Sequence, residues 1–277
     1  MKLVSYVYCG QPWVGALVEG GIVSLTEGYL KEALANDLLD ELAEMADGRT
    51  PDLMLRDVMM LPVIPDAGKI LCIGLNYANH VAETKRPESQ HPTVFVRYAD
   101  SQVGHQQPLV RPAGCDRFDY EGELAIVIGR GGRNISEARA MDHVAGYACY
   151  NDGSARDWQR HTSQFTPGKT FPGTGGFGPA LVTPDEVGDY TQLPISTRLN
   201  GEVMQQATLA DLIFPIPRLI AYCSAFTPLA PGDVIVTGTP GGVGDRREPP
   251  VYMKPGDVCE IDIGVVGTLV NTVVDAE

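Results

Sequence analysis

The sequence predicts an α+β fold that is rich in β-strands. Short apolar runs recur along the chain and end at turns that contain Gly or Pro, and few segments show a helical repeat. Strands and helices do not alternate as they do in a βαβ fold. A chain of 277 residues is long enough to bury a large core. We therefore expect a strand-rich catalytic or binding domain preceded by a smaller module.

The first 65 residues predict a small N-terminal α+β domain with a linker, and residues 66–277 predict the main domain. Residues 2–26 read as short strands broken by turns. A single helix follows and ends at Gly48, because apolar residues recur at helical spacing with acidic residues on the other face. These apolar residues are Leu34, Leu38, Leu39, Leu42 and Met45. The Pro-containing stretch 51–65 is expected to be the linker.

Residues 69–83 join an apolar strand to a short helix that carries a histidine and a glutamate. His80 and Glu83 are i and i+3 neighbours, so the carboxylate can orient the imidazole, as a general base requires. The alternative is a surface His–Glu contact, which this spacing does not exclude. The polar residues 76–90 have few apolar anchors after Val81, which predicts a mobile lid.

Two glutamates lie two residues apart where the hydrophobic strand within 118–128 begins. On a strand, Glu121 and Glu123 project from the same face at roughly 6–7 Å. They would repel each other unless a cation lies between them. Mg²⁺ prefers oxygen ligands at about 2.0–2.1 Å and usually keeps water or substrate oxygens in its shell. The alternative is an exposed acidic strand edge.

Asp152 is the candidate for a third carboxylate ligand. It follows the buried strand 145–150 at a predicted strand-to-helix turn, and ligands often bind at such strand ends. As an alternative, Asp152 could be the N-cap of the following helix and bind no metal. Asp157, inside that helix, is expected to pair with an Arg or to face water.

The rest of the chain predicts further strands and one more helix. The Gly-rich segment 171–178 is expected to be a loop that lacks the Lys-Ser/Thr of a phosphate-binding loop. Asn200-Gly201 predicts a hairpin with a type I′ turn, and a helix is expected over roughly 209–226. Pro-Gly-Asp turns at 231–233 and 255–257 each precede an apolar strand, as in a β-rich roll.

Five motifs in a fixed order resemble the fumarylacetoacetate hydrolase family, from Lys69 to the end of the chain. They are Gly74-Leu75-Asn76-Tyr77 with His80 and Glu83, Tyr120-Glu121-Gly122-Glu123-Leu124, Asn151-Asp152 with Ala155-Arg156-Asp157, Lys169, and Thr237-Gly238-Thr239-Pro240-Gly241-Gly242-Val243-Gly244. The resemblance implies a mixed β-sandwich roll of the kind formed by that family's C-terminal domain. Its metal would lie in a cavity ringed by strand ends.

The resemblance also implies a role for each matching residue. It implies that Mg²⁺ or Mn²⁺ is bound by Glu121, Glu123 and Asp152, and that the catalytic groups are His80, Glu83 and Lys169. Gln159 is expected to contact the substrate. The remaining residues expected to bind substrate are Arg97, Tyr98, Arg156 and Thr239.

Two departures from the family's pattern leave the substrate open. Leu75 stands where acylpyruvate-cleaving members often have Arg, and Arg97-Tyr98 stands where Lys-Pro is frequent.

The predicted function is a metal-dependent hydrolase that cleaves a carbon–carbon bond in a 2,4-diketo acid of the acylpyruvate or fumarylpyruvate type. Water activated by His80 would attack one carbonyl, and the leaving fragment would depart as a metal-bound enolate. The alternative is an oxaloacetate decarboxylase or keto–enol tautomerase that uses the same site. A remote alternative is a non-catalytic ligand-binding protein.

Composition limits the partners. The chain has 21 basic and 35 acidic residues, a net charge of −14 and a pI near 4.7, which argue against nucleic acid and anionic membranes. A small diketo acid must therefore be attracted by local Arg, Lys or metal charge. Strand edges and the apolar segment 209–217 predict a homodimer.

Cysteine usage predicts a cytoplasmic protein. The six cysteines show no C-x-x-C pair and no His at ligand spacing, so we expect free thiols and a reducing compartment. Residues 1–6 read as a strand rather than a signal peptide, and no run approaches about 18 apolar residues.

Overall fold

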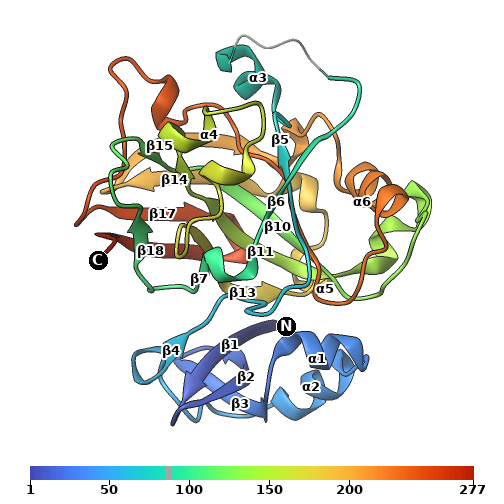
Figure 1. Cartoon of the computed structure of the whole chain (residues 1–277). Helices are drawn as coiled ribbons and strands as arrows, with labels where there is room; N and C mark the ends of the chain where they lie inside the picture. The colour runs from blue at the N-terminus through green and yellow to red at the C-terminus, as the bar shows by residue number, and fades with distance from the viewer. Residues whose placement is uncertain (85–88) are drawn as a thin grey trace.

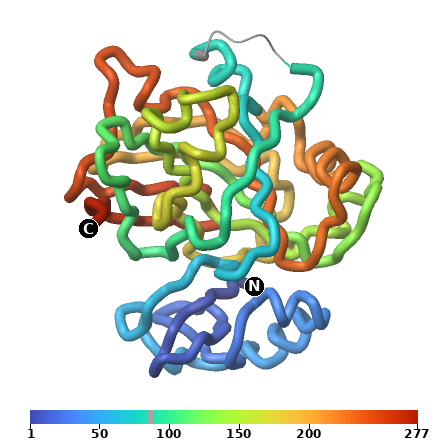
Figure 2. Tube along the Cα trace, viewed as in Figure 1, coloured from blue at the N-terminus to red at the C-terminus, as the bar shows by residue number. Residues whose placement is uncertain are grey.

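The computed structural model describes residues 1–84 and 89–277 and confirms a strand-rich α+β fold (Figures 1 and 2). Within these residues the larger sheet is mixed and has eleven strands. Its order is β3 (Gly21–Glu27), β2 (Gln11–Val18), β1 (Lys2–Tyr8), β13 (Gly175–Val182), β11 (Val144–Asp152), β10 (Gly122–Ile128), β16 (Val234–Val236), β5 (Ile70–Gly74) and β6 (Thr93–Arg97). Two short strands join it, since β4 (Met59–Met60) pairs with β1 and β7 (Gln102–Val103) with β13.

A second sheet of five strands packs against the larger one. Its order is β15 (Glu202–Thr208), β14 (Pro194–Leu199), β17 (Val258–Asp262), β18 (Thr268–Asp275) and β8 (Leu109–Arg111). The short strands β9 (Phe118–Asp119) and β12 (Ser154–Ala155) pair with each other. The predicted hairpin joins β14 and β15, and Asn200 and Gly201 have φ of 53° and 82°, as a type I′ turn requires.

The helices are short. They are α1 (Leu30–Ala35), α2 (Leu39–Ala46), α3 (Ala78–Thr84), α4 (Arg156–Gln159), α5 (Pro184–Val187) and α6 (Ile216–Phe226). Additional 3₁₀ segments are Leu55–Asp57, Ala99–Ser101, Glu137–His143, Thr166–Gly168, Tyr190–Gln192, Leu209–Asp211, Gly244–Arg246 and Gly264–Val266. No helix in the described part of the chain is long and apolar enough to cross a membrane.

Both long helices predicted from the sequence are interrupted. The helix expected to end at Gly48 is two helices, α1 and α2, because Asp37 adopts a left-handed φ of 58° and the Leu38 amide turns back to the Ala33 carbonyl. The helix expected over 209–226 starts only at Ile216, because Pro215 precedes it in an extended conformation (φ −69°, ψ 162°).

The Gly-rich segment 171–178 is only partly a loop, since β13 starts at Gly175. Glycine is needed there because the strand passes close to buried polar side chains. A Cβ at Gly175 would lie 2.7 Å from Gln102 Oε1 and 2.8 Å from Arg97 Nη2. The sequence pattern could not show this close contact, because Gln102 and Arg97 come from another part of the chain.

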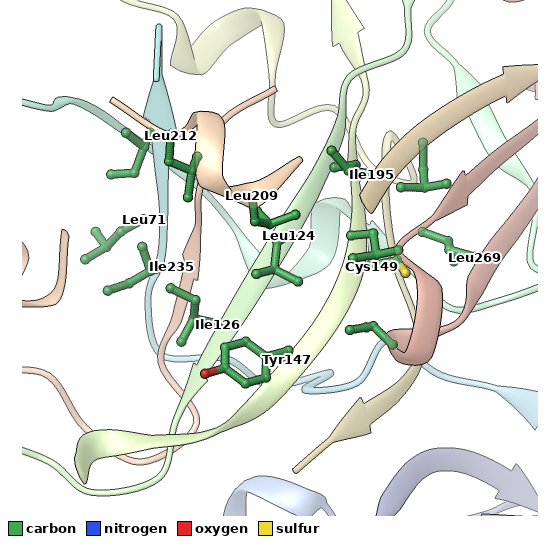
Figure 3. Close-up of a cluster of buried hydrophobic side chains, with 14 of the residues drawn as sticks. Leu71, Leu124, Ile126, Tyr147, Cys149, Ile195, Leu209, Leu212, Ile235 and Leu269 are labelled. Carbon is green, nitrogen blue, oxygen red and sulfur yellow. The ribbon is translucent and has the colours of Figure 1, made fainter. Parts of the chain in front are cut away.

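The hydrophobic core lies between the two sheets. Along β10, Leu124 and Ile126 point into this core, while Ala125 and Val127 point to the opposite face. Figure 3 shows Leu124 and Ile126 in the same cluster as Ile195 of β14 and Leu269 of β18. Because both faces of β10 are covered, every residue of this strand is buried.

The N-terminal residues form a lobe of their own at the bottom of Figure 1. This lobe continues the main sheet, because β1 pairs with β13 through Lys2 with Val182 and Leu3 with Leu181. One hydrophobic cluster contains residues of both parts, such as Leu34 of the lobe and Val127 of the main domain. The predicted domain 1–65 is thus attached to the rest by a sheet and a shared core.

Candidate active site

The register of β10 against β11 brings three carboxylates together. Gly122 pairs with Asn151, and the Asp152 amide donates to the Glu121 carbonyl at 2.8 Å. One oxygen each of Glu121, Glu123 and Asp152 lies within 4.8 Å of the others. These residues are 5%, 2% and 0% exposed, so the alternative of an exposed acidic edge is wrong. The N-cap of α4 is Ala155, so Asp152 does not cap that helix.

Three buried cations surround this carboxylate cluster (Glu121, Glu123 and Asp152). Lys169 Nζ donates to Glu121 Oε2 at 2.6 Å and to Asp152 Oδ2 at 2.5 Å. Arg97 Nη1 donates to the other Asp152 oxygen at 2.6 Å. Arg156 Nη2 lies 2.6 Å from Glu121 Oε1. Glu123 has a backbone partner instead, since the Gly238 amide donates to its Oε2 at 2.5 Å.

Two carboxylates of the cluster have pKa values that are shifted in opposite directions. Burial would raise the pKa of Glu121, but Lys169 and Arg156 outweigh burial and lower it to about 2. Burial raises the pKa of Glu123 well above its usual range, and the charges of Asp152 and Glu121 raise it further. Glu123 therefore needs either a proton or an additional cation nearby.

The donor set fits a hard divalent metal ion. All three candidate ligands are carboxylates, which are the oxygen donors that Mg²⁺ and Mn²⁺ prefer. An ion beside Glu123 would supply the positive charge that this carboxylate lacks. Glu123 and Asp152 lie on the paired strands β10 and β11, and Glu121 directly precedes β10, where its carbonyl accepts from the Asp152 amide. Glu121, Glu123 and Asp152 can therefore hold a metal.

His80 and Glu83 lie on α3 as the sequence predicts. His80 Nδ1 is 3.4 Å from Glu83 Oε2, and the Gly242 amide donates to Glu83 Oε1 at 2.6 Å. His80 is only 8% exposed, so the pair is more than a surface contact. Part of the predicted lid, residues 85–88, lies outside the described residues.

A cavity of about 460 Å³ connects these groups. It is lined by seven of the expected site residues: His80, Glu121, Glu123, Arg156, Gln159, Lys169 and Thr239. The remaining wall is partly apolar and partly charged, and includes Ile73, Leu75, Phe95, Phe165, Val243, Arg160, Asp245 and Arg246. The arrangement therefore combines a carboxylate cluster, a histidine with a carboxylate partner, and cationic side chains around one space.

Two residues expected to contact substrate are not in the cavity lining. The Arg97 side chain is fully buried and also donates to the Gly153 carbonyl at 3.0 Å and to Thr174 Oγ1 at 2.7 Å. Arg97 therefore positions Asp152 from outside the cavity lining. Tyr98 is 58% exposed. Asp157, expected to pair with an Arg or to face water, instead accepts hydrogen bonds from the backbone amides of Asp116 and Arg117.

Sequence reasoning missed two residues that organise the site. Asp119 is fully buried and accepts from Arg156 Nη2 at 2.7 Å and from the Gly244 amide at 2.8 Å. Gln205 Oε1 accepts from the Gly122 amide at 3.0 Å, and its Nε2 donates to Thr239 Oγ1 at 2.8 Å. Asp119 stands two residues before Glu121, which is a signal that could have been used.

Comparisons with known proteins identify relatives of this chain. The family model described as Fumarylacetoacetate (FAA) hydrolase C-terminal matches residues 69–274. The mitochondrial oxaloacetate tautomerase fahd2 of Xenopus laevis is 44% identical over 220 residues, which cover 79% of this chain and 69% of the relative. The 5-carboxymethyl-2-hydroxymuconate delta-isomerase structure from Mycobacterium smegmatis is 31% identical, with a TM-score of 0.79 and full coverage of both chains.

A further solved structure contains a metal. Maleylpyruvate hydrolase from Sphingobium sp. SYK-6, in complex with manganese(II) ion and pyruvate, is 26% identical, with a TM-score of 0.83 and full coverage of both chains. The relatives thus include a tautomerase, an isomerase and a hydrolase. They favour the alternative reaction, keto–enol tautomerisation, over the carbon–carbon hydrolysis predicted first. The mitochondrial location of the Xenopus laevis protein leaves the expected cytoplasmic location unconfirmed.

Proposed function

This chain belongs to the fumarylacetoacetate hydrolase family, and we propose that it is a metal-dependent keto–enol tautomerase of oxaloacetate or a closely related 2-keto acid. The observation that carries the proposal is the buried cluster of Glu121, Glu123 and Asp152 at a cavity that His80 also lines. An oxaloacetate tautomerase that is 44% identical supports the choice of reaction.

The metal would be held by Glu121, Glu123 and Asp152. When bound, Mg²⁺ or Mn²⁺ would act as a Lewis acid that stabilises negative charge on the oxygens of the substrate. The choice between the two metals is part of the proposal, supported by the oxygen donor set and by the manganese in the maleylpyruvate hydrolase structure.

Tautomerisation moves a proton between carbon and oxygen, so it needs a base near the reacting carbon. His80 is our candidate, because it lines the cavity and its Nδ1 lies 3.4 Å from Glu83 Oε2. With the proton on Nδ1 the histidine can donate to Glu83, and its Nε2 can act as the base. Glu83 is itself held by the Gly242 amide. Lys169 is unsuited to the role of base. Burial would lower its pKa, but Asp152 and Glu121 outweigh burial and raise it, so its ammonium keeps the proton.

The remaining expected residues that line the cavity would bind the substrate. Lys169 and Arg156 supply positive charge on one side of the cavity, although both also bind cluster carboxylates. Gln159 is oriented by Arg156 Nη1, which donates to its Oε1 at 2.8 Å, and its amide nitrogen is the group we assign to the substrate. Thr239 is positioned by Gln205.

Hydrolysis of an acylpyruvate or fumarylpyruvate is the second candidate. The specific observation in its favour is the His80–Glu83 pair, since a histidine oriented by a carboxylate can also activate water. The likeness to maleylpyruvate hydrolase supports it as well. Oxaloacetate decarboxylation would use the same cluster without an attacking water.

One set of assays separates these reactions. The purified chain with Mg²⁺ or Mn²⁺ is given enol-oxaloacetate, and loss of the enol absorbance is followed. Pyruvate release is measured from oxaloacetate and, separately, from fumarylpyruvate and acylpyruvates. We expect enol loss well above the metal-only rate, without matching pyruvate release. His80→Ala should lower that rate by about 10²–10⁴ while leaving Mn²⁺ affinity intact, and Glu83→Gln should lower it less.

Other assay results would replace the proposed tautomerase reaction with a different one. Rapid pyruvate release from fumarylpyruvate, with no effect on the oxaloacetate enol, would make hydrolysis the reaction. Pyruvate release from oxaloacetate would make it a decarboxylase. No turnover of any of these compounds would point to a ligand-binding protein.

A further inference from the structure

We propose, building on the function proposed above, that Arg160 and Arg246 form a distal anion subsite that binds the second carboxylate of a 2-keto dicarboxylic acid. The keto-acid end of the same molecule would lie at the carboxylate cluster. Neither arginine was expected from the sequence to bind substrate. Both line the cavity that contains Glu121, Glu123 and His80.

The two arginines come from different segments that meet at this cavity. Arg160 follows directly after α4, and Arg246 ends the 3₁₀ segment Gly244–Arg246. The cavity volume of about 460 Å³ falls in the range of roughly 300–1,000 Å³ typical of small-molecule sites. The lining also includes the apolar side chains Ile73, Leu75, Phe95, Phe165 and Val243. This lining suits a carbon chain with an anionic group at each end.

The charges at Arg160 and Arg246 are only partly neutralised. Asp245, 2% exposed at its side chain, accepts from Arg160 Nη2 and lies 3.8 Å from Arg246 Nε. The same carboxylate also accepts from Arg117 Nη2 at 2.5 Å and from the Tyr252 hydroxyl at 2.9 Å. Within the described residues, the single carboxylate of Asp245 therefore pairs with three guanidinium groups, those of Arg117, Arg160 and Arg246.

Arg156 differs from this pair. It lies 2.7 Å from Asp119 Oδ2 and 2.6 Å from Glu121 Oε1, and Glu121 also binds Lys169. The three buried cations Arg156, Lys169 and Arg97 are thus matched by three carboxylates, which are Asp119, Glu121 and Asp152. The surplus positive charge of the cavity is therefore at Arg160 and Arg246.

Both side chains are placed so that a ligand can reach them. The Arg160 and Arg246 side chains are 44% and 37% exposed, whereas the Asp245 that positions them is buried. A guanidinium offers several N–H donors in a planar fork, so contact with Asp245 leaves others for a substrate carboxylate. A local positive surplus also matters because the chain carries a net charge of −14, which repels anions at longer range.

The test compares two ligands that differ only at the far end. 2-Oxoadipate and 2-oxohexanoate have six carbons and the same keto-acid group, but only the first has a second carboxylate. Each is titrated calorimetrically into the Mn²⁺-loaded protein. In the wild type we expect the diacid to bind at least about tenfold tighter, the usual scale of one charge-assisted contact. Arg160→Gln and Arg246→Gln should each reduce this ratio severalfold, and the double variant should bring it close to one.

Arg139→Gln is the matched control. Arg139 pairs with a single carboxylate, Asp142, at 2.5 Å, and its side chain is 67% exposed outside the cavity. It should keep the wild-type ratio. Binding of 2-oxohexanoate by the cavity variants confirms that they are folded.

The two proposals fail in different ways. If both keto acids bind but the ratio is near one in the wild type, or is unchanged by the arginine substitutions, the distal subsite is wrong and the tautomerase proposal stands. If neither compound binds the Mn²⁺-loaded wild type, the keto-acid site is wrong and the subsite falls with it. A ratio that responds to Arg160 and Arg246 in a protein without tautomerase activity supports the subsite and leaves the reaction to be reassigned.

Discussion

Glu123 is the residue at which the needs of metal binding and of folding stability most clearly conflict. It is buried beside Asp152 and Glu121, and these neighbours and its burial raise its pKa well above the usual range. Since the pKa is raised on folding, the penalty is absent below the pKa of the unfolded chain and grows as pH rises above it. The Gly238 amide, which donates to Glu123 Oε2, offsets only part of this cost.

Replacing Glu123 with Gln should therefore have opposite effects on metal binding and on stability. A glutamine can still accept from the Gly238 amide, but it removes one of the three proposed anionic metal ligands. We expect Mn²⁺ affinity measured by calorimetry to fall at least about 100-fold, which is the upper end for loss of an outer-shell partner. We also expect the metal-free variant to be more stable than wild type in urea at pH 8. Glu202→Gln, on an exposed position of β15, should change neither. Unchanged Mn²⁺ affinity in Glu123→Gln would remove this residue from the metal site.

At the scale of elements, the hairpin of β14 and β15 supports the start of β10. Gln205 reaches from β15 to accept from the Gly122 amide and from Thr197 Oγ1, and it donates to Thr239 Oγ1 and the Pro240 carbonyl. Gly122 lies between Glu121 and Glu123, so this one side chain connects the strand that carries the proposed metal ligands to the loop after β16.

Gln205→Met should lower both stability and metal affinity. The substitution keeps the approximate size but leaves the buried Gly122 amide without its acceptor, which costs about 1–3 kcal/mol. Urea unfolding measures this loss, and calorimetry should show weaker Mn²⁺ binding because the carboxylates are less well held. Gln206→Met tests the same exchange at the next, exposed position and should be close to neutral. Equal stability of the two variants would contradict the role assigned to Gln205.

The elements also show what a sequence can and cannot predict. The strand that starts near Glu121 and the hairpin at Asn200-Gly201 were predictable, because each depends on a pattern within a few residues. The break between α1 and α2 was not, because Asp37 adopts a left-handed conformation that its type tolerates but does not require. Other features depend on contacts between distant segments. These are the roles of Gln205 and Asp245 and the support of Asp152 by Arg97. No local pattern records such contacts.

At the scale of the whole molecule, the predicted homodimer remains a proposal with a revised reason. The apolar segment 209–217 was expected to be covered by a partner, but Leu209, Leu212 and Ile216 are buried within the chain itself. Exposed large side chains lie elsewhere, including Tyr98, Trp158 and Phe226. We expect light scattering at micromolar concentration to give about twice 29.8 kDa. A mass near 29.8 kDa would contradict the dimer.

The last prediction concerns how metal binding and pH together set the stability of the whole chain. A ligand that binds only the folded state raises its stability, and a metal must first displace any proton held by its carboxylate ligands. In the metal-free protein the raised pKa of Glu123 favours a proton there, whereas the pKa of Glu121 is lowered to about 2, so Glu121 is ionised throughout the neutral range. Competition between proton and metal at Glu123 should therefore weaken as pH rises. Thermal unfolding with and without a fixed concentration of Mn²⁺, between pH 5.5 and 8, should show a rise in Tm that grows with pH. Glu123→Gln should show a smaller rise with little dependence on pH, because the competing proton is gone. A Tm increase in the wild type that is the same at every pH would mean that Glu123 does not exchange a proton for the metal.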